Sequence, residues 1–282
     1  MALIETKGLT YTYPGASHPS ISDVSVKVEK GEFVLITGPS GCGKTTLCRT
    51  FNGLIPQFYQ GELKGEITVA GLDAAKHPTY EMAKHVGLVF QNPENQLFAL
   101  SVEKDVAFGL ENLGFDREEM RKRVDWALNL TGIYDLRERS PHEVSGGQQQ
   151  RVAIASVLAM QPEIIVLDEP TSFLDPLSAE KIFEVIHDLN KRLGLTVVLV
   201  EHRLDLTAKY ADHIIIMDQG KVRFDGETRS VLSNEETRLM GVGIPKATLL
   251  YELLKKENTN LGDVTPLSSD ELAKMLLEAM KH

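Results

Sequence analysis

The chain has 282 residues, of which 42% are apolar and 25% charged, and its formal net charge is −10 at pH 7. These values indicate a globular protein with a substantial core and exclude a disordered or fibrous chain. The acidic balance also argues against a nucleic-acid-binding protein, because such proteins normally carry a basic surface. No apolar run approaches the roughly 20 residues that a membrane-spanning helix needs. The N-terminus does not resemble a secretory signal, so we expect any membrane role to depend on partner subunits.

Short apolar runs alternate with helical patterns along most of the chain. The runs read as strands are Leu3–Leu9, Val24–Val28, Phe33–Thr37, Glu66–Val69, Val86–Phe90, Ile164–Leu167, Thr196–Val200, His213–Met217 and Lys221–Phe224. The helical patterns are Lys44–Gly53, Val102–Leu113, Glu118–Thr131, Gly146–Met160 and Leu177–Leu193. This alternation predicts an α/β fold with a mostly parallel sheet, and the early strands without intervening helices predict an antiparallel portion.

Two regions lack strand patterns and are expected to be helical. Residues of about 92–161 contain only helical patterns, which predicts a helical subdomain inserted into the sheet domain of residues 1–233. Residues 234–282 form a C-terminal extension with amphipathic segments at Thr248–Lys255 and Ser269–Met280. Ser268 and Glu271 have the spacing of a capping box at the start of the second segment.

A phosphate-binding loop is predicted between the strand Phe33–Thr37 and the helix that follows it. The sequence from Gly38 to Thr45 fits the G-x-x-x-x-G-K-[ST] pattern in full. Backbone amides and the helix dipole can hold phosphate there, with charge from Lys44 and a Mg²⁺ ligand from Thr45. The expected nucleotide-binding residues of this loop are Gly38, Pro39, Ser40, Gly41, Cys42, Gly43, Lys44, Thr45 and Thr46.

Two acids end the strand Ile164–Leu167 and are expected beside this loop. Asp168 suits the Mg²⁺ shell, and Glu169 can polarise a water molecule that attacks the terminal phosphate. The second acid favours hydrolysis over a simple nucleotide switch. The loop also contains Cys42, for which the helix N-terminus predicts a lowered thiol pKa, and no disulfide with the nearby Cys48 is expected.

A second anion-binding helix start is predicted at the segment Ser145, Gly146, Gly147 and Gln148, which we call the signature segment. Ser145 is a good N-cap, and the glycines leave backbone amides exposed. Because one nucleotide already has its phosphates on the first loop, the simplest interpretation is that this helix covers the nucleotide of another subunit. A head-to-tail dimer with two nucleotides at the interface follows.

The phosphate loop, the signature segment and the acid pair, in this order, resemble the ATP-binding cassette (ABC) family over residues 1–230. The resemblance implies an ATPase that uses ATP and Mg²⁺. It assigns Gln91 to the Q-loop as a ligand of Mg²⁺ or water, His202 to the switch that contacts the γ-phosphate, and Ser172–Asp175 to the D-loop. It places Tyr13 on the adenine, with Tyr11 as a near competitor.

The segment that begins at Gln91 resembles the ATPases of energy-coupling factor (ECF) transporters, including the cobalt and nickel uptake branch. That resemblance implies a peripheral subunit on the cytoplasmic face of the cell membrane. Its partners would be a second ATPase, identical or paralogous, an integral coupling subunit and a substrate-binding membrane subunit. The C-terminal extension would help to hold the ATPase dimer together. The alternatives are the ATPase of a conventional ABC transporter, or a non-transport ABC ATPase that acts on nucleic acid or ribosomes.

Next to Gln91, part of the apolar set Leu97, Phe98 and Leu100 is expected to be exposed as a docking surface for the membrane subunit, with Leu97 or Phe98 in the contact. They follow a polar stretch of five residues, which favours exposure of part of the set.

Overall fold

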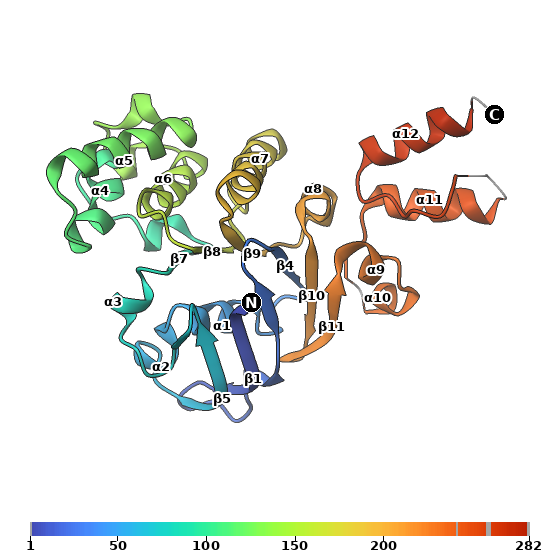
Figure 1. The fold of residues 1–282 in the computed structure, drawn as a ribbon, viewed down its shortest axis with the longest axis horizontal. Coiled ribbons are helices and arrows are strands. Elements are labelled where there is room, and N and C mark those ends of the chain that lie inside the picture. The colour runs from blue at the N-terminus through green and yellow to red at the C-terminus, as the bar shows by residue number, and fades with distance from the viewer. Residues whose placement is uncertain (1, 241, 258–260, 281–282) are drawn as a thin grey trace.

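The structure is a computed structural model that describes residues 2–240, 242–257 and 261–280. Its strands form two sheets, one below the other in Figure 1. The first sheet is antiparallel and has the strand order β2-β1-β5-β6, with β3 also paired to β1. Its strands are β1 (Ala2–Thr12), β2 (Ile21–Val24), β3 (Lys27–Glu29), β5 (Glu62–Val69) and β6 (Leu72–Asp73). The predicted single strand Val24–Val28 is therefore wrong, because the chain breaks between β2 and β3.

The second sheet is the central one and has the order β11-β10-β4-β9-β8-β7. All neighbours in it are parallel except β10 and β11, which form a hairpin. Its strands are β4 (Phe33–Thr37), β7 (Val86–Val89), β8 (Ile164–Asp168), β9 (Thr196–Val200), β10 (His213–Asp218) and β11 (Lys221–Glu227). A parallel strand buried on both faces needs apolar residues throughout, which is what β4, β8 and β9 contain.

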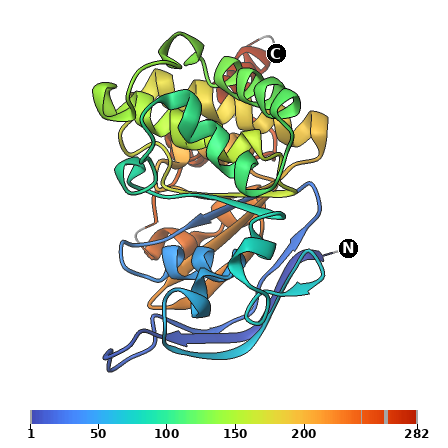
Figure 2. The ribbon, with the colours of Figure 1, turned by 90° about the vertical axis from the view of Figure 1, so that its left-hand side faces the viewer.

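The helices cover both faces of the central sheet, as Figure 2 shows from the side of α4 to α6. The longer helices are α1 (Lys44–Phe51), α4 (Val102–Asn112), α5 (Arg117–Leu130), α6 (Gly146–Ala159), α7 (Pro176–Leu193), α11 (Lys246–Lys256) and α12 (Ser269–Ala279). The short ones are α2 (Leu54–Gln57), α3 (Thr79–Met82), α8 (Leu204–Thr207), α9 (Thr228–Leu232) and α10 (Glu235–Leu239), with 3-10 turns η1 (Pro93–Asn95), η2 (Tyr134–Leu136), η3 (Pro141–Glu143) and η4 (Ala208–Tyr210).

Strand β4 shows how the two faces are filled. Phe33 and Leu35 point into the apolar core that the sheet shares with α4 to α7. Val34 and Ile36 point into the second core, which includes residues of α1 and of the antiparallel sheet. This alternation of side chains places one apolar layer on each side of the central sheet. The predicted fold class, with a mostly parallel sheet, an antiparallel portion, a helical insertion and a helical C-terminal extension, is confirmed.

The C-terminal helices α11 and α12 lie on the opposite side of the molecule from α4 to α6 (Figure 1). They share a small apolar cluster around Tyr251 and Leu272, while Leu267 packs into the main core. Ser268 caps α12 as predicted, but the Glu271 carboxylate accepts from the Leu267 amide and from Arg229 rather than closing a capping box. The extension is thus fastened to the body by a buried side chain and an ion pair.

His213 at the start of β10 gives the fold a pH dependence. Its ring bonds the Asp225 carboxylate and lies 3.2 Å from the Glu32 carboxylate, and these two partners, Asp225 first, raise the pKa of His213 from 6.5 to about 9. A raised pKa in the folded state stabilises the protein fully below the unfolded pKa and loses that effect as the pH rises through the folded value.

We expect His213→Gln to lower the free energy of unfolding by about 1–3 kcal/mol at pH 6 and by much less at pH 10, since each pKa unit corresponds to about 1.4 kcal/mol. Urea unfolding of both proteins at pH 6, 8 and 10 measures the difference. A difference that stays constant over this range would contradict the ion-pair explanation.

Candidate nucleotide-binding and hydrolysis site

The carboxyl ends of four adjacent parallel strands bring the predicted site residues together. The strands β4, β9, β8 and β7 lie side by side and run in the same direction. The phosphate loop follows β4, Asp168 ends β8, Gln91 follows β7 and His202 follows β9. Ligands of open α/β sheets bind at this edge, because loops from several strands meet there.

The phosphate loop between β4 and α1 depends on two glycines. Gly38 has φ 143°, and a Cβ there would come within 2.0 Å of the Met217 carbonyl oxygen. Gly43, the N-cap of α1, has φ 106°, and a Cβ there would lie 2.6 Å from the Ser20 carbonyl oxygen. Any side chain at either position would displace backbone, so the close wrapping of the loop requires glycine.

A cavity of about 290 Å³ lies inside this loop and extends to the strand ends. Its lining includes Ser40, Gly41, Gly43, Lys44, Thr45, Thr46, Gln91 and Glu169. Gly38, Pro39 and Cys42 complete the loop without lining the cavity. Lys44 is buried, and its Nζ donates to the carbonyl oxygens of Gly38 at 2.9 Å and Pro39 at 3.0 Å. The loop therefore holds the Lys44 ammonium at the place where it would neutralise the charge of a bound phosphate.

Thr45 and Asp168 have the chemistry of a magnesium site. Asp168 is 3% exposed, its carboxylate lies beside the Thr45 hydroxyl, and one carboxylate oxygen, Oδ1, has no hydrogen-bond partner. Burial raises the pKa of Asp168, and the neighbouring Glu169 adds to the effect. A buried carboxylate with a free oxygen beside a hydroxyl fits a hard divalent cation, which favours the charged form and prefers oxygen ligands.

Metal-ligating side chains of the described residues do not by themselves form a cage. Within residues 2–240, 242–257 and 261–280, no group of three or more His, Cys, Asp or Glu side chains could hold a metal ion. Mg²⁺ commonly uses one or two protein oxygens together with phosphate oxygens of the substrate. Thr45 and Asp168 supply such a pair at the edge of the phosphate loop.

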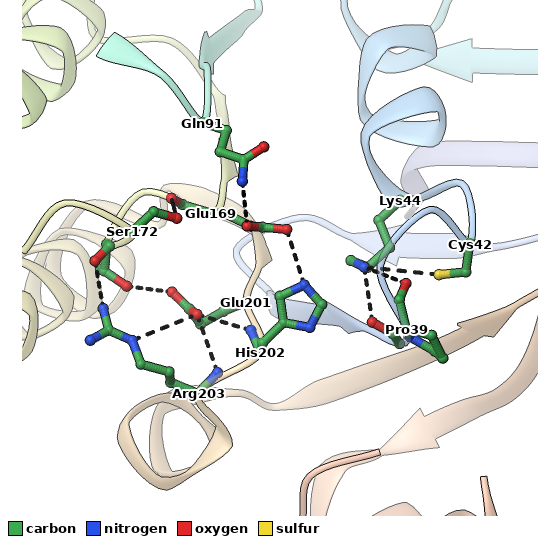
Figure 3. Close-up of polar contacts among 11 residues, drawn as sticks. Pro39, Cys42, Lys44, Gln91, Glu169, Ser172, Glu201, His202 and Arg203 are labelled. Carbon is green, nitrogen blue, oxygen red and sulfur yellow. Dashed lines mark hydrogen bonds and ion pairs between the residues drawn. The ribbon is translucent and has the colours of Figure 1, made fainter. Parts of the chain in front are cut away.

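Glu169 lies between Gln91 and His202, as Figure 3 shows. The Gln91 side-chain amide donates to Glu169 Oε2 at 2.7 Å, and His202 Nε2 lies 3.0 Å from Glu169 Oε1. We call these three residues the Glu169 cluster. The structure therefore assembles three side chains that the sequence places 78 and 33 positions apart.

The backbone of Glu169 is itself unusual. Its φ is 49°, a left-handed conformation that costs a non-glycine residue on the order of 1 kcal/mol or more. Its amide donates to the Val200 carbonyl of β9 at 3.0 Å, which holds the turn in place. The turn directs the Glu169 side chain to the cavity while Asp168 stays buried one residue earlier. Strained residues of this kind concentrate at functional sites.

Tyr11 and Tyr13 have different environments. Tyr11 is fully buried, and its hydroxyl donates to the carbonyl oxygens of Tyr59 and Gln60. Tyr13 is half-buried, and its hydroxyl lies 3.3 Å from the Thr46 hydroxyl in the first turn of α1. Of the two candidates for contact with adenine, Tyr13 is therefore the one beside the phosphate loop, whereas Tyr11 is a core residue.

The expectation for Cys42 is wrong. The loop buries its side chain, and this burial raises the pKa of the Cys42 thiol despite the nearby Lys44 and the helix start. The sequence shows the helix dipole but not the desolvation that opposes it. Cys42 and Cys48 are both free thiols, as expected.

The signature segment starts α6 as predicted. The Ser145 hydroxyl accepts from the Gln148 amide, and the Gln148 side chain accepts from the Ser145 amide at 2.9 Å, which forms a capping box. Ser145 and Gly146 are exposed, and none of the segment's residues lines the phosphate-loop cavity. The first turn of α6 is thus not part of the chain's own nucleotide cavity.

Sequence reasoning missed a buried polar group next to the Glu169 cluster. Glu201 accepts from the Thr171 hydroxyl and the Arg203 amide, and the Arg203 guanidinium donates to the Thr171 carbonyl oxygen; we call these three residues the Glu201 cluster. An acid immediately before a histidine at a strand end reads as a solvated residue. The sequence signal for this cluster is weak: Glu201 directly precedes His202, and Thr171 directly precedes Ser172 of the predicted D-loop.

A phosphate loop, an acid pair and converging strand ends define a nucleotide-hydrolysing P-loop protein. The ABC transporter family model matches residues 21–172, and the chain belongs to that family. It is thus an ATP-binding ABC transporter ATPase with resemblance to the ECF type.

Known relatives show the same class. The chain is 44% identical to the energy-coupling factor transporter ATP-binding protein EcfA of Methanocaldococcus jannaschii, over 92% of this chain and 91% of the relative. The structure of cbiO1 from Clostridium perfringens, part of the ABC transporter complex cbiONQ, matches with TM-score 0.73 and 34% identity, over 89% and 99% of the chains. The dimeric cassette MJ0796 bound to ADP and Pi matches with TM-score 0.72 and 31% identity, over 80% and 99%.

No helix within the described ranges has both the length and the apolar character needed to cross a membrane.

Proposed function

We propose that this chain energises an ECF-type membrane importer of vitamins or transition-metal ions, through ATP-driven closure of a head-to-tail ATPase dimer. The observation that carries the proposal is the Glu169 carboxylate, held by Gln91 and His202 at the edge of the phosphate-loop cavity. Similarity to EcfA and cbiO1 supports the ECF type.

Phosphate binding is assigned to the loop amides and to Lys44. The amides of residues 41–46 and the N-terminus of α1 stabilise the negative charge of the β- and γ-phosphates. Lys44 exchanges its bonds with the Gly38 and Pro39 carbonyls for phosphate oxygens. Thr45, Asp168 and Gln91 are the residues that would hold Mg²⁺, which neutralises phosphate charge when bound. Tyr13 supports the adenine by stacking.

Hydrolysis is assigned to the Glu169 cluster. Glu169 accepts a proton from the attacking water as the water oxygen bonds to the γ-phosphorus. The bond between that phosphorus and the bridging oxygen breaks, and ADP leaves with the electron pair. Gln91 and His202 already contact the two oxygens of that carboxylate, so they hold it and can bridge to the water and the γ-phosphate. Because the three side chains come from three different strand ends, any change in the loops around the γ-phosphate alters this geometry.

The signature segment is assigned to the second nucleotide of the dimer. Ser145 and Gly146 are exposed at a helix start that does not line the chain's own cavity. A partner ATPase, a second copy or a paralogue, would present its γ-phosphate to them. The dimeric structure of MJ0796 with ADP and Pi supports the formation of a dimer. The C-terminal extension, residues 234–282, would add contacts that keep the two ATPases together.

Docking to the membrane subunits is assigned to a groove between α3 and α4. A cavity of about 660 Å³ there is lined by residues that include Leu54, Tyr80, Phe108 and Met160. Phe98 is 60% exposed, and its ring stacks edge-to-face on Phe108 with a centroid distance of 4.6 Å. Such a groove fits an apolar cytoplasmic helix of an integral subunit. The chain would then sit on the cytoplasmic face of the cell membrane.

The expectation that Leu97 contributes to the docking surface is wrong. Leu97 is 5% exposed and packs in the main core with residues of α4 and α6. The buried Asp105 carboxylate accepts from the amides of Phe98 and Ala99, which turns the chain so that Leu97 points inward and Phe98 outward. Sequence polarity alone does not reveal such a turn.

We expect Phe98→Asp to reduce recovery of the integral subunits at least about tenfold, because a charge would replace the exposed ring that packs on Phe108, a residue of the groove lining. The tagged chain would be purified from detergent-extracted membranes and its integral partners quantified. Binding of ATP to the isolated chain should not change.

Leu193→Asp is the matched control, since Leu193 is 68% exposed at the end of α7, outside the groove. Full retention of the integral subunits by Phe98→Asp would place the docking surface elsewhere. Recovery of ribosomes or DNA in place of integral proteins with the unmodified chain would contradict the transport role itself.

A further inference from the structure

The loop after β9 contains a buried carboxylate that does not line the nucleotide cavity. Glu201 is 4% exposed and directly precedes His202. Its Oε1 accepts from the His202 amide at 2.9 Å and from the Arg203 amide at 3.2 Å. These two bonds fix the backbone turn that carries His202. The direction of the His202 ring toward Glu169 therefore depends on the Glu201 carboxylate.

The second oxygen of this carboxylate reaches the other catalytic strand end. Glu201 Oε2 accepts from the hydroxyl of Thr171, a fully buried residue two positions after Glu169. The Arg203 guanidinium donates to the Thr171 carbonyl oxygen at 2.6 Å and lies 3.9 Å from Glu201 Oε1. The Glu201 cluster thus forms a closed ring of contacts between the loop after β8 and the loop after β9 (Figure 3).

The ring continues toward the signature segment. Thr171 is followed by Ser172, whose hydroxyl donates to the Glu169 carbonyl oxygen at 3.1 Å, and by Phe173. The Phe173 side chain lies 3.8 Å from where a Cβ on Gly146 would be. The same group of bonds therefore connects the residue assigned to the γ-phosphate with the helix start assigned to the partner subunit.

A buried carboxylate needs such partners to be tolerated. Removing a carboxylate from water costs several kcal/mol unless hydrogen bonds and opposite charge offset it. The Glu201 carboxylate accepts hydrogen bonds from two backbone amides and one hydroxyl, and the Arg203 guanidinium lies nearby. The bond from the Glu169 amide to the Val200 carbonyl joins the same two strand ends one residue earlier. That backbone bond holds the ends of β8 and β9 together, whereas Glu201 holds the turns after these strands, which carry Thr171 and His202.

We propose that Glu201, together with Arg203 and Thr171, is a positioning residue for hydrolysis that holds His202 against Glu169. This inference rests on the proposed role of Glu169. It assigns to Glu201 an effect on the rate of the chemical step and none on nucleotide binding, because its carboxylate contacts neither the phosphate loop nor the cavity.

The test compares the steady-state kinetics of ATP hydrolysis for Glu201→Ala and Glu201→Gln. We expect Glu201→Ala to lower kcat about 10- to 100-fold with the KM for ATP within about threefold, since displacement of a catalytic group by about 1 Å costs up to 100-fold. Glu201→Gln should restore kcat to within about fivefold of the unmodified chain, because the amide oxygen can accept both backbone amides and the Thr171 hydroxyl can turn to accept from the amide nitrogen.

Arg203→Met is a second variant in case Glu201→Ala does not fold, since its side chain is 35% exposed and the apolar stem is kept. We expect it to lower kcat about tenfold with an unchanged KM, for the same geometric reason. Asn190→Ala is the matched control: Asn190 is 2% exposed and bridges the Gly31 and Leu195 carbonyls at the opposite ends of β4 and β9. It should lose stability and keep its kcat.

Three outcomes separate the claims. If folded Glu201→Ala or Arg203→Met hydrolyses ATP at the unmodified rate, or if KM rises in step with the loss of kcat, the positioning role is overturned. If Glu201→Gln is as inactive as Glu201→Ala, the hydrogen bonds that position His202 are not what Glu201 contributes, and the proposal is likewise overturned. If the unmodified chain, alone and in its membrane complex, hydrolyses no ATP, the proposed function fails instead.

Discussion

Replacing Glu169 with glutamine is expected to lower kcat for ATP hydrolysis by at least about 100-fold, the usual contribution of a positioned general base. Glutamine has the same shape, so it can keep contacts with Gln91 and His202, but it cannot take a proton from water. The phosphate loop and Asp168 are untouched. ATP affinity should therefore stay within about threefold, because the loop contacts that bind the nucleotide remain.

Phosphate release and fluorescent-nucleotide binding measure the two quantities separately. Glu163→Gln is the matched control, since Glu163 is an acid at the opposite end of β8, where it contacts His85 at 2.9 Å. It should hydrolyse ATP at the unmodified rate. Turnover by Glu169→Gln within about threefold of the unmodified chain would remove Glu169 from the role of general base.

The second large effect is expected when two inactive variants are mixed. Lys44→Ala lacks the ammonium group that would bind phosphate in its own phosphate loop. Gly147→Asp places an acid at the start of α6, and even its Cβ would lie 3.1 Å from Leu174. Each variant alone should be inactive. In a homodimer with cross-chain sites, half of the randomly mixed dimers contain one intact site of two, so activity should return to about a quarter of the unmodified value.

Native mass spectrometry would establish that mixed dimers form. Absence of recovery in such a mixture would contradict cross-chain sites, provided that hydrolysis does not require both sites at once. Mixing the unmodified chain with Lys44→Ala tests that requirement, because strict two-site cooperativity would then remove the activity of the mixed dimers.

The sequence predicts the site well where function depends on local pattern and strand ends. The phosphate loop, Asp168 and Glu169 each follow a continuous apolar strand, and parallel strands necessarily bring their carboxyl ends to one edge. Gln91 and His202 could be placed only through the family resemblance. Their common contact with Glu169 depends on the strand order β7-β8-β9, which no local pattern contains.

The remaining features depend on burial, which a sequence does not display. Desolvation raises the thiol pKa of Cys42 against the helix dipole, and Asp105 turns Leu97 into the core. The strand predicted at Val24–Val28 breaks because β2 and β3 pair with different parts of β1. The role of Glu201 has no local sequence signal, because its hydroxyl partner Thr171 lies 30 positions away.

The central claim is that ATP binding joins two ATPase subunits head to tail. The most direct measurement is the mass of Glu169→Gln, by light scattering of the isolated chain and of the particle extracted from membranes, with and without Mg-ATP. We expect Mg-ATP to convert the isolated chain of 31.3 kDa into a particle of twice that mass. If the partner is a paralogue, we expect the chain to form the ATP-bound dimer with that paralogue in the membrane particle. Each dimer should bind two nucleotides. A chain that is saturated with ATP and remains monomeric in both preparations would contradict it.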